Sequence, residues 1–387
     1  MGSSSLRQRV ALSLALLAVL PARAAPYMIV GNDEKPGTDA QGKPMVNPTG
    51  NDTVVIFDLA TPEDPKPVVS LKLENSIVGP PVNLAISPDN RIALVADSMT
   101  VSEDNGTRKM VPTDKLFVID LQASPPKLAQ TVAVGKQPSG LSINPKGDLA
   151  LVANRADGTI SVLKIDGTTV TQTATVPVSP GVSHVEFTPD GKRALALKSP
   201  DNKVALLDID GDKVSYTKLD IPTYLFPYNV VVSPDSKLAI TADNGNSGSS
   251  DGNLDAVTVI DLEGAHPHAI AHLTVGDAPE GLAISPKGNV AAVLNVDGSN
   301  FKGQWFYHPN GSVTVLSIRG KNVAPAGAVE VGAFPEPIAF TPDGRYLYVG
   351  NYADQDFSIL KVDGSSIINT GKRFKAGGHP ASMRMGP

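Results

Sequence analysis

The sequence contains no cysteine, and this absence excludes several kinds of site at once. The chain can form no disulfide, no thiolate metal centre and no covalent c-type haem. Aromatic residues make up only 5% of the chain, whereas 35 Gly and 33 Pro are present. Few large rings and many turn-forming residues favour numerous short strands joined by tight turns.

Clusters of basic residues are also missing, and long apolar runs are rare. The formal net charge of −6 opposes binding to nucleic acid through its phosphates. One apolar run, residues 10–20, follows a basic start and precedes small residues up to Ala24. It is too short to span a bilayer, so we interpret residues 1–24 as a signal peptide, with cleavage one residue later as the close alternative. This predicts a periplasmic or secreted protein with no membrane span; a buried N-terminal helix is the competing interpretation.

A repeated pattern is the strongest signal in the chain. Each copy has a short apolar strand, a turn built on Pro-Asp or Pro-Lys followed by Gly, Asn or Ser, and a second alternating strand. Two further apolar segments follow each copy, so each unit predicts a four-stranded antiparallel sheet. A single sheet of this kind cannot bury both faces alone, and packing in a ring solves that problem. The six copies are residues 83–97, 140–154, 184–198, 229–243, 281–295 and 337–351.

The two ends of the chain each carry part of one further unit. Residues 26–32, 53–59 and 68–73 look like strands two to four of a blade that has no first strand. Residues 381–387 look like a first strand with nothing after it. We therefore predict an all-β, seven-bladed β-propeller in which the C-terminal strand joins the N-terminal blade and removes an open sheet edge. The predicted blades are residues 26–81 plus 381–387, 82–138, 139–182, 183–227, 228–279, 280–335 and 336–380.

Two second-strand segments resemble a known repeat. LYVGNYAD (347–354) and LVANRADG (151–158), together with the Pro-Asp-Gly turns, resemble the YVTN family of seven-bladed propellers. The resemblance spans residues 25–387 and implies the same fold. It implies no single activity, because that family includes binding proteins, surface proteins and relatives of lactonases and amine dehydrogenase heavy chains.

Long insertions gather on one predicted rim of the ring, at the loops between second and third strands. Insertions on one side of a repeat array commonly mark a binding face, so we predict a small-molecule ligand or a protein partner there; surface decoration is the alternative. The insertions are residues 32–52, 97–114, 243–255 and 295–311.

The last insertion carries the only Trp of the chain, in an aromatic run. Aromatic side chains in a surface loop suit a planar ligand or a partner, and they can equally pin the loop to the rim. The candidate ligand-binding residues in this run are Trp305, Phe306, Tyr307 and His308.

The innermost strands place a few polar residues near the central channel. Most positions there are small or apolar, but His184, Glu186 and Arg384 are polar and fall on one strand face. They predict a polar pocket at the channel mouth, or else an ion pair that plugs the channel. Further ligand-binding candidates on these strands are Asn83, Asn229, Glu280 and Glu336.

A comparison with the lactonase branch of such propellers makes one enzyme hypothesis concrete. Members of that branch tend to have a His before the inner-strand motif and a Glu at the end of the next strand. His184 matches the first position, but Lys198 occupies the second. The resemblance implies a lactone hydrolase or lactonising enzyme with His184 as base, Glu186 orienting it and Arg384 stabilising the anion.

Three functional hypotheses follow. The leading one is an exported, non-catalytic propeller that binds a ligand or protein on its loop-rich face. A lactonase-like enzyme is the alternative, and an accessory subunit of a periplasmic redox system is the third. We expect a monomer with no cofactor and no metal. His266, His268 and His272 lie close together in the sequence. In an extended chain, however, His268 and His272 would lie about 13 Å apart, which is too far to share a metal ion.

Overall fold

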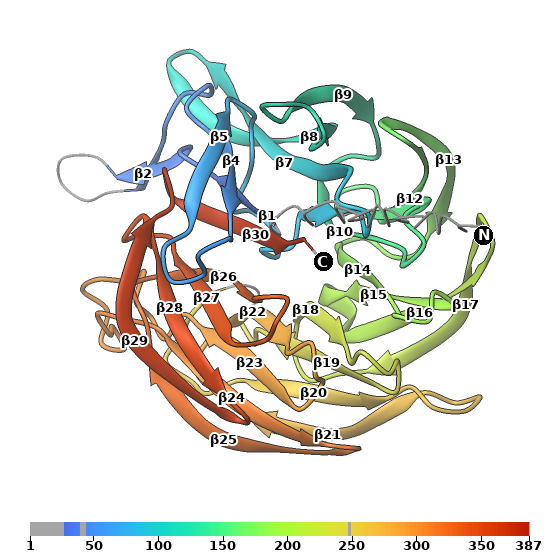
Figure 1. The fold of residues 1–387 in the computed structure, drawn as a ribbon, viewed down its shortest axis with the longest axis vertical. Helices are drawn as coiled ribbons and strands as arrows, with labels where there is room; N and C mark the ends of the chain where they lie inside the picture. The colour runs from blue at the N-terminus through green and yellow to red at the C-terminus, as the bar shows by residue number, and fades with distance from the viewer. Residues whose placement is uncertain (1–26, 39–43, 247–248, 387) are drawn as a thin grey trace, which may run out of the picture.

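The computed structural model describes residues 27–38, 44–246 and 249–386, so the predicted signal peptide lies outside the described part. The described residues form seven four-stranded antiparallel sheets arranged around one axis (Figure 1). The predicted all-β, seven-bladed β-propeller is confirmed. Within the described ranges, the one helix is a single 3-10 turn, Ser199–Asp201, and no helix is long and apolar enough to cross a membrane.

Each blade runs from an inner strand beside the axis to an outer strand at the edge of the ring. From inside to outside, the blades are β30 (Pro380–Met385), β1 (Tyr27–Asn32), β4 (Thr53–Asp58) and β5 (Lys66–Leu71); β6 (Leu84–Ile86), β7 (Ile92–Asp104), β8 (Thr107–Asp120) and β9 (Lys127–Ala133); β10 (Pro138–Ile143), β11 (Leu149–Asn154), β12 (Thr159–Asp166) and β13 (Thr169–Pro177); β14 (Val182–Phe187), β15 (Arg193–Lys198), β16 (Lys203–Asp210) and β17 (Lys213–Pro222); β18 (Pro227–Val232), β19 (Leu238–Asp243), β20 (Ala256–Asp261) and β21 (His268–Thr274); β22 (Pro279–Ile284), β23 (Val290–Asn295), β24 (Ser312–Arg319) and β25 (Asn322–Glu330); and β26 (Pro335–Phe340), β27 (Tyr346–Asn351), β28 (Asp356–Asp363) and β29 (Ser366–Lys375).

The ring closes where the two ends of the chain meet. β30 pairs antiparallel with β1, in a register that runs from Met28 opposite Met385 to Asn32 opposite Pro380. Met383 is 2% exposed and belongs to a core cluster shared by the first and last blades. The C-terminal strand is therefore the inner strand of the N-terminal blade, as the unpaired repeat fragments predicted.

The repeated turns between first and second strands are stabilised by their own side chains. In the first complete repeat, the N–H of Asn90 donates to the carbonyl of Ser87 at 2.8 Å, and Asn90 has a φ of +54°. The Ser87 hydroxyl donates to the Asp89 carboxylate at 2.6 Å and accepts the N–H of Ile92 at 3.1 Å. A Ser or Thr before the proline, or Asn144 in one repeat, thus fixes the turn, and a residue that tolerates positive φ completes it.

An Asn at the end of several second strands ties neighbouring loops together. The side-chain oxygen of Asn351 accepts the N–H of Gly332 at 2.9 Å, and its amide donates to Ser358 at 3.0 Å. Asn295 makes the equivalent bonds to Gly276 and Thr314. The Asn of the repeat therefore holds the link that leads from the preceding blade into its own blade.

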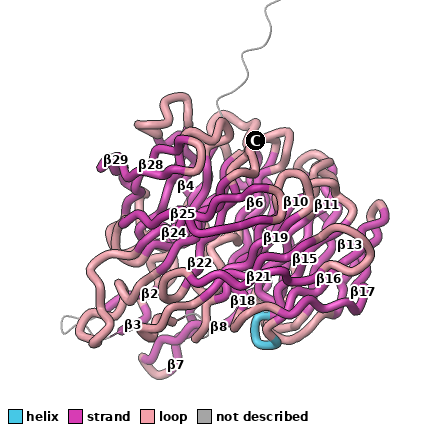
Figure 2. Tube along the Cα trace, turned by 90° about the horizontal axis from the view of Figure 1, so that it is seen from below, coloured by secondary structure: helices cyan, strands magenta, loops and turns pink. Residues whose placement is uncertain are grey.

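The insertions and the turns lie on opposite rims. β2 (Pro36–Thr38) and β3 (Pro44–Val46) form a hairpin inside the first insertion, and β7 and β8 extend as a long hairpin. Figure 2 shows these elements at one rim and the C-terminal end at the other. The loops after β19 and β23 leave from the equivalent strand ends. We call the insertion side the loop rim and the side of the Pro-Asp-Gly turns the turn rim.

Candidate functional site

Two insertions from neighbouring blades meet on the loop rim and form a groove. One follows β19 and the other follows β23. The N–H of Gly298 donates to the hydroxyl of Ser250 at 3.0 Å and joins the two loops. Gly252 has a φ of +84°, and a Cβ there would lie only 2.7 Å from the Cβ of Phe306, so the contact requires glycine. The groove has a volume of about 490 Å³, which is in the range of small-molecule sites.

The aromatic run of the second insertion forms one wall of this groove. Phe306 packs edge-on against Phe301 with ring centroids 5.9 Å apart, and against Trp305 with centroids 5.5 Å apart. Phe306 therefore holds the loop in place. The Trp305 side chain, by contrast, is 83% exposed to solvent. His308 also lines the groove, and Tyr307 does not.

Three carboxylates lie in the same groove: Asp277 from the link before β22, Asp297 after β23, and Glu330 at the end of β25. Asp277 accepts the N–H groups of Asp251 and Gly252 at 3.2 and 2.9 Å. Burial, followed by the nearby charges of Asp251 and Asp297, raises the pKa of Asp277 despite these bonds. The groove is therefore electronegative.

The polar residues at the loop-rim end of the inner strands are buried instead of lining an open pocket. Glu280 and Glu336 are 6% and 1% exposed and are hydrogen-bonded to each other. Burial raises the pKa of both carboxyl groups, and the charge of Glu280 raises the pKa of Glu336 further. Tyr228 is also buried and makes a hydrogen bond with the backbone of Gly79, in a segment that belongs to another side of the ring.

Two asparagines from the candidate set are likewise buried near the axis. The Asn83 amide donates to the carbonyl of Ala96 at 2.9 Å, a bond that positions β6 against β7. Asn229 is 1% exposed, and neither of its amide atoms has a hydrogen-bond partner among the described residues. Neither side chain lines the groove.

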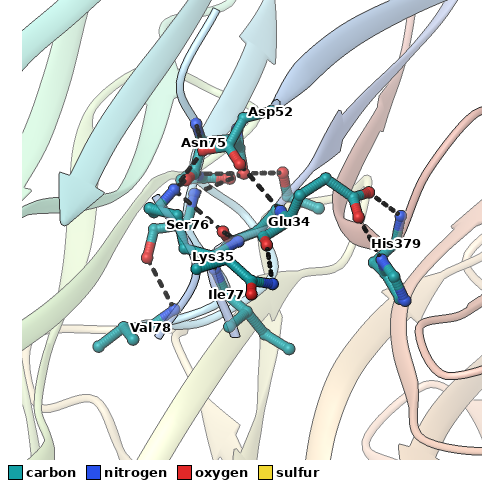
Figure 3. Close-up of polar contacts among 12 residues, drawn as sticks. Glu34, Lys35, Asp52, Asn75, Ser76, Ile77, Val78 and His379 are labelled. Atoms are coloured by element: carbon teal, nitrogen blue, oxygen red, sulfur yellow. Dashed lines mark hydrogen bonds and ion pairs between the residues drawn. The ribbon is translucent and has the colours of Figure 1, made fainter. Parts of the chain in front are cut away.

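A buried ion cluster holds the segment that reaches Tyr228 (Figure 3). Lys35 is fully buried, with its ammonium 3.0 Å from Asp33 and also in contact with Asp52 and the carbonyl of Asn75. Asp33 in turn accepts the N–H of Ile77 at 2.8 Å. The cluster therefore ties the loop after β1 to the segment 74–81 between β5 and β6.

The structure brings His184, Glu186 and Arg384 together at the turn-rim end of the channel. His184 Nε2 and Arg384 Nη2 each lie 3.4 Å from Glu186 Oε2. The Glu186 and Arg384 side chains, about one-quarter exposed, line a cavity of about 250 Å³. Glu280 and Glu336 do not line this cavity, so the two polar sets are separate.

His184 itself is completely buried in this arrangement. Its ring packs against Gly140, where a Cβ would come within 2.6 Å of the imidazole, and Nδ1 accepts the N–H of Val230 at 3.4 Å. Burial lowers the pKa of His184 despite the nearby Glu186. The imidazole is therefore neutral, and its Nε2 faces the Glu186 carboxylate from the buried side.

Lys198, at the position where the lactonase branch has Glu, has a structural role in this blade. Its ammonium lies 2.8 Å from Asp220 and 3.2 Å from Asp201. These carboxylates outweigh the effect of burial and raise the pKa of Lys198 to about 12. No acidic group of the lactonase type stands at this position.

The histidines near β21 are separately engaged. His268 Nδ1 contacts the carbonyl of His266 at 3.0 Å, and His272 Nδ1 lies 2.9 Å from the Thr258 hydroxyl. Across residues 27–38, 44–246 and 249–386, no group of three or more His, Asp or Glu side chains has the geometry of a metal site.

Comparison with known proteins supports the fold but assigns no family. No protein-family model matches the sequence, and no curated protein matches it significantly. The periplasmic gluconolactonase of Pseudomonas aeruginosa has a TM-score of 0.69 and 18% identity, covering 94% of this chain and 99% of that chain. A putative 6-phosphogluconolactonase from Bacteroides fragilis has a TM-score of 0.69 and 17% identity, covering 94% and 98%. Hydrazine synthase of Kuenenia stuttgartiensis has a TM-score of 0.58 and 19% identity, covering 76% and 79%.

These neighbours define a seven-bladed β-propeller whose structural relatives include lactonase-like proteins. At identities below one fifth, the likeness establishes the fold alone. The resemblance to YVTN repeats rests on the repeats themselves, since no family model supports it.

Sequence reasoning found the aromatic wall of the groove but missed its carboxylates. Asp277 and Glu330 lie outside the insertions, in a blade link and at a strand end. The one available signal was the Asp that follows the second-strand Asn, as in Asn295-Val296-Asp297, which caps the adjacent link by accepting the N–H of Asp277 at 3.0 Å.

Proposed function

We propose that this chain is an exported, non-catalytic propeller that binds a small-molecule ligand in the groove on its loop rim. The observation that carries the proposal is the Trp305 indole, 83% exposed at the edge of a groove of about 490 Å³. A large ring exposed to water gains free energy when a ligand covers it. Rigid strands of two blades hold the loops in place, an arrangement frequent in binding sites. Export is supported by the basic start and apolar run of residues 1–24.

The only Trp of the chain makes this proposal directly testable. A small-molecule extract of the source cells is incubated with the protein, and retained compounds are identified by mass spectrometry and titrated back. We expect a retained compound to change the Trp305 emission, and Trp305→Ala to weaken its binding at least tenfold, measured by calorimetry.

The matched control is Ile368→Ala, which removes a 60% exposed side chain from β29, away from the groove. Its affinity for the compound should equal that of the unmodified protein. If Trp305→Ala and Ile368→Ala bind the compound with equal affinity, and the compound leaves the Trp305 emission of the unmodified protein unchanged, a binding site in the groove is refuted.

A second candidate function, lactone hydrolysis, is favoured by one observation. Glu186 and Arg384 share the turn-rim cavity, with neutral His184 behind Glu186. Because His184 is fully buried, Glu186 is the group that could take a proton from water as the water oxygen attacks the lactone carbonyl. Arg384 would donate to the carbonyl oxygen as it becomes negative, and the ring C–O bond would then break, with the proton passing to the leaving alkoxide.

The candidate enzyme is tested with δ-gluconolactone, by following acid release. Hydrolysis above the spontaneous rate should fall at least about a hundredfold in Glu186→Gln, since a lost general base typically costs that much. Trp305→Ala serves as the control and should retain the full rate. An unchanged rate in Glu186→Gln, or none above background in the unmodified protein, would remove this candidate.

A further inference from the structure

The lining of the loop-rim groove combines a negative charge with a free aromatic face and apolar surface. We infer that its ligand is a small organic cation, with an ammonium or guanidinium head beside an apolar body. This inference rests on the proposed function, because it specifies the chemistry of the ligand bound at that site.

The charge of the groove is not neutralised within its own lining. The carboxylates are Asp277, Asp297 and Glu330, and the described lining contains neither Lys nor Arg. Their partners are neutral donors: Asp297 accepts the Ser312 hydroxyl at 2.5 Å, and Glu330 accepts the Asn310 amide at 2.9 Å. A cation entering the groove would meet several carboxylates with no Lys or Arg side chain to displace.

Two further acidic residues neighbour Asp277 and add to the negative charge near the groove. Asp251 and Asp255 lie on the insertion that follows β19. Burial first, and then the neighbouring Asp277 and Asp251, raise the pKa of Asp255 to about 6. Such mutual repulsion is relieved when an opposite charge binds nearby, and an anionic ligand would increase it.

The non-polar part of the lining determines which kind of cation fits. Trp305 presents the ring type with the strongest cation–π attraction, and this attraction favours alkylammonium and guanidinium groups. Leu254, 68% exposed, and Val329 add apolar surface to the same groove. A metal ion would find no set of three carboxylates arranged around one point within the described residues. An amphiphilic amine matches both halves of the lining.

The test compares three probes of nearly equal shape on the full-length protein. 2-Phenylethylamine is cationic, 2-phenylethanol is neutral and phenylacetate is anionic at neutral pH. Each is titrated while Trp305 emission is recorded, with calorimetry for the dissociation constant. We expect the amine to bind at least tenfold more tightly than the alcohol, and phenylacetate to bind most weakly. Raising the salt concentration should weaken the amine alone.

A charge variant assigns the preference to this groove. Glu330→Gln keeps an acceptor for Asn310 and removes one negative charge, so it should weaken amine binding three- to tenfold and leave the alcohol unchanged. Glu263→Gln is the matched control, because Glu263 is an exposed acid in the turn after β20 on the opposite rim.

The possible outcomes distinguish failure of the inferred ligand chemistry from failure of the proposed binding function. Tighter binding of the alcohol or of phenylacetate, with a change in Trp305 emission, would overturn the cationic ligand and retain the groove as a binding site. Equal saturation of the emission change by calcium chloride would also overturn an organic cation. Amine binding that Trp305→Ala leaves intact would place the interaction elsewhere and refute the inference.

Discussion

A chain that stops at residue 379 is expected to lose the folded ring. The deletion removes β30, and with it the ladder to β1 and the buried side chains of Ala381, Ser382 and Met383. Burial of the Met383 side chain stabilises the fold by about 1.5–3 kcal/mol. Each lost hydrogen bond between β30 and β1 costs about 1 kcal/mol of stability. The sum exceeds about 5 kcal/mol, comparable to the whole stability of many domains. Circular dichroism should show no cooperative melt, and size exclusion should show an expanded or aggregated species.

Two controls make this result specific to strand pairing. A chain that stops after Met385 keeps the whole of β30 and loses, among the described contacts, the 2.7 Å hydrogen bond from the Gly386 N–H to the Tyr27 carbonyl. Its melting temperature should lie within about 3 °C of that of the full chain. A synthetic peptide of residues 378–387, added to the shorter chain, should restore the melt by supplying the strand in trans. A truncated protein that melts like the full chain would contradict closure by β30.

Lys35→Met is expected to cause a large loss of stability through a single side chain. It removes the cation that Asp33 and Asp52 face in a fully buried site and leaves two carboxylates without it. Breaking one side of a buried ion pair costs about 3–5 kcal/mol. Urea unfolding followed by circular dichroism should therefore show a fall of this size in the free energy of unfolding. By contrast Lys66→Met, at an exposed pair with Asp64, should cost less than about 1 kcal/mol.

The cost of Lys35→Met should also depend on pH, with a definite sign. Burial already raises the pKa of Asp33 above its ordinary value, and removal of Lys35 raises it further. A carboxyl whose folded pKa is raised stabilises the protein at low pH and loses that contribution as the pH rises through the folded pKa. The variant should therefore recover part of its stability between neutral pH and pH 5. If its deficit equals that of Lys66→Met at every pH, the ion cluster has no stabilising role.

The architecture could be predicted because each blade repeats the same local chemistry. The prolines of the turns set the strand pairs, and the unmatched segments 26–32 and 381–387 left one pairing to complete the ring. The position of the insertions followed from the same meander. These inferences needed only strand order and turn type, which a single sequence contains.

The sites were less predictable because they depend on contacts between loops that do not repeat. Glu186 and Arg384 were identified as neighbours from strand position alone, and they lie 3.4 Å apart. Lys35 was not among the predicted site residues; it is buried against the segment 74–81, whose path no periodicity indicates. Glu280 and Glu336 were predicted to reach the channel mouth, but they are buried and hydrogen-bonded to each other.

The single indole of this molecule has a practical consequence for anyone who studies it. Trp305 stands in a surface loop outside every sheet, so its fluorescence is already that of a largely hydrated ring before denaturant is added. The Trp305 emission will report ligand binding near the indole and will change little when the blades unfold. Far-ultraviolet dichroism is therefore the signal for global unfolding, and the two spectroscopies together separate occupancy from denaturation in one sample.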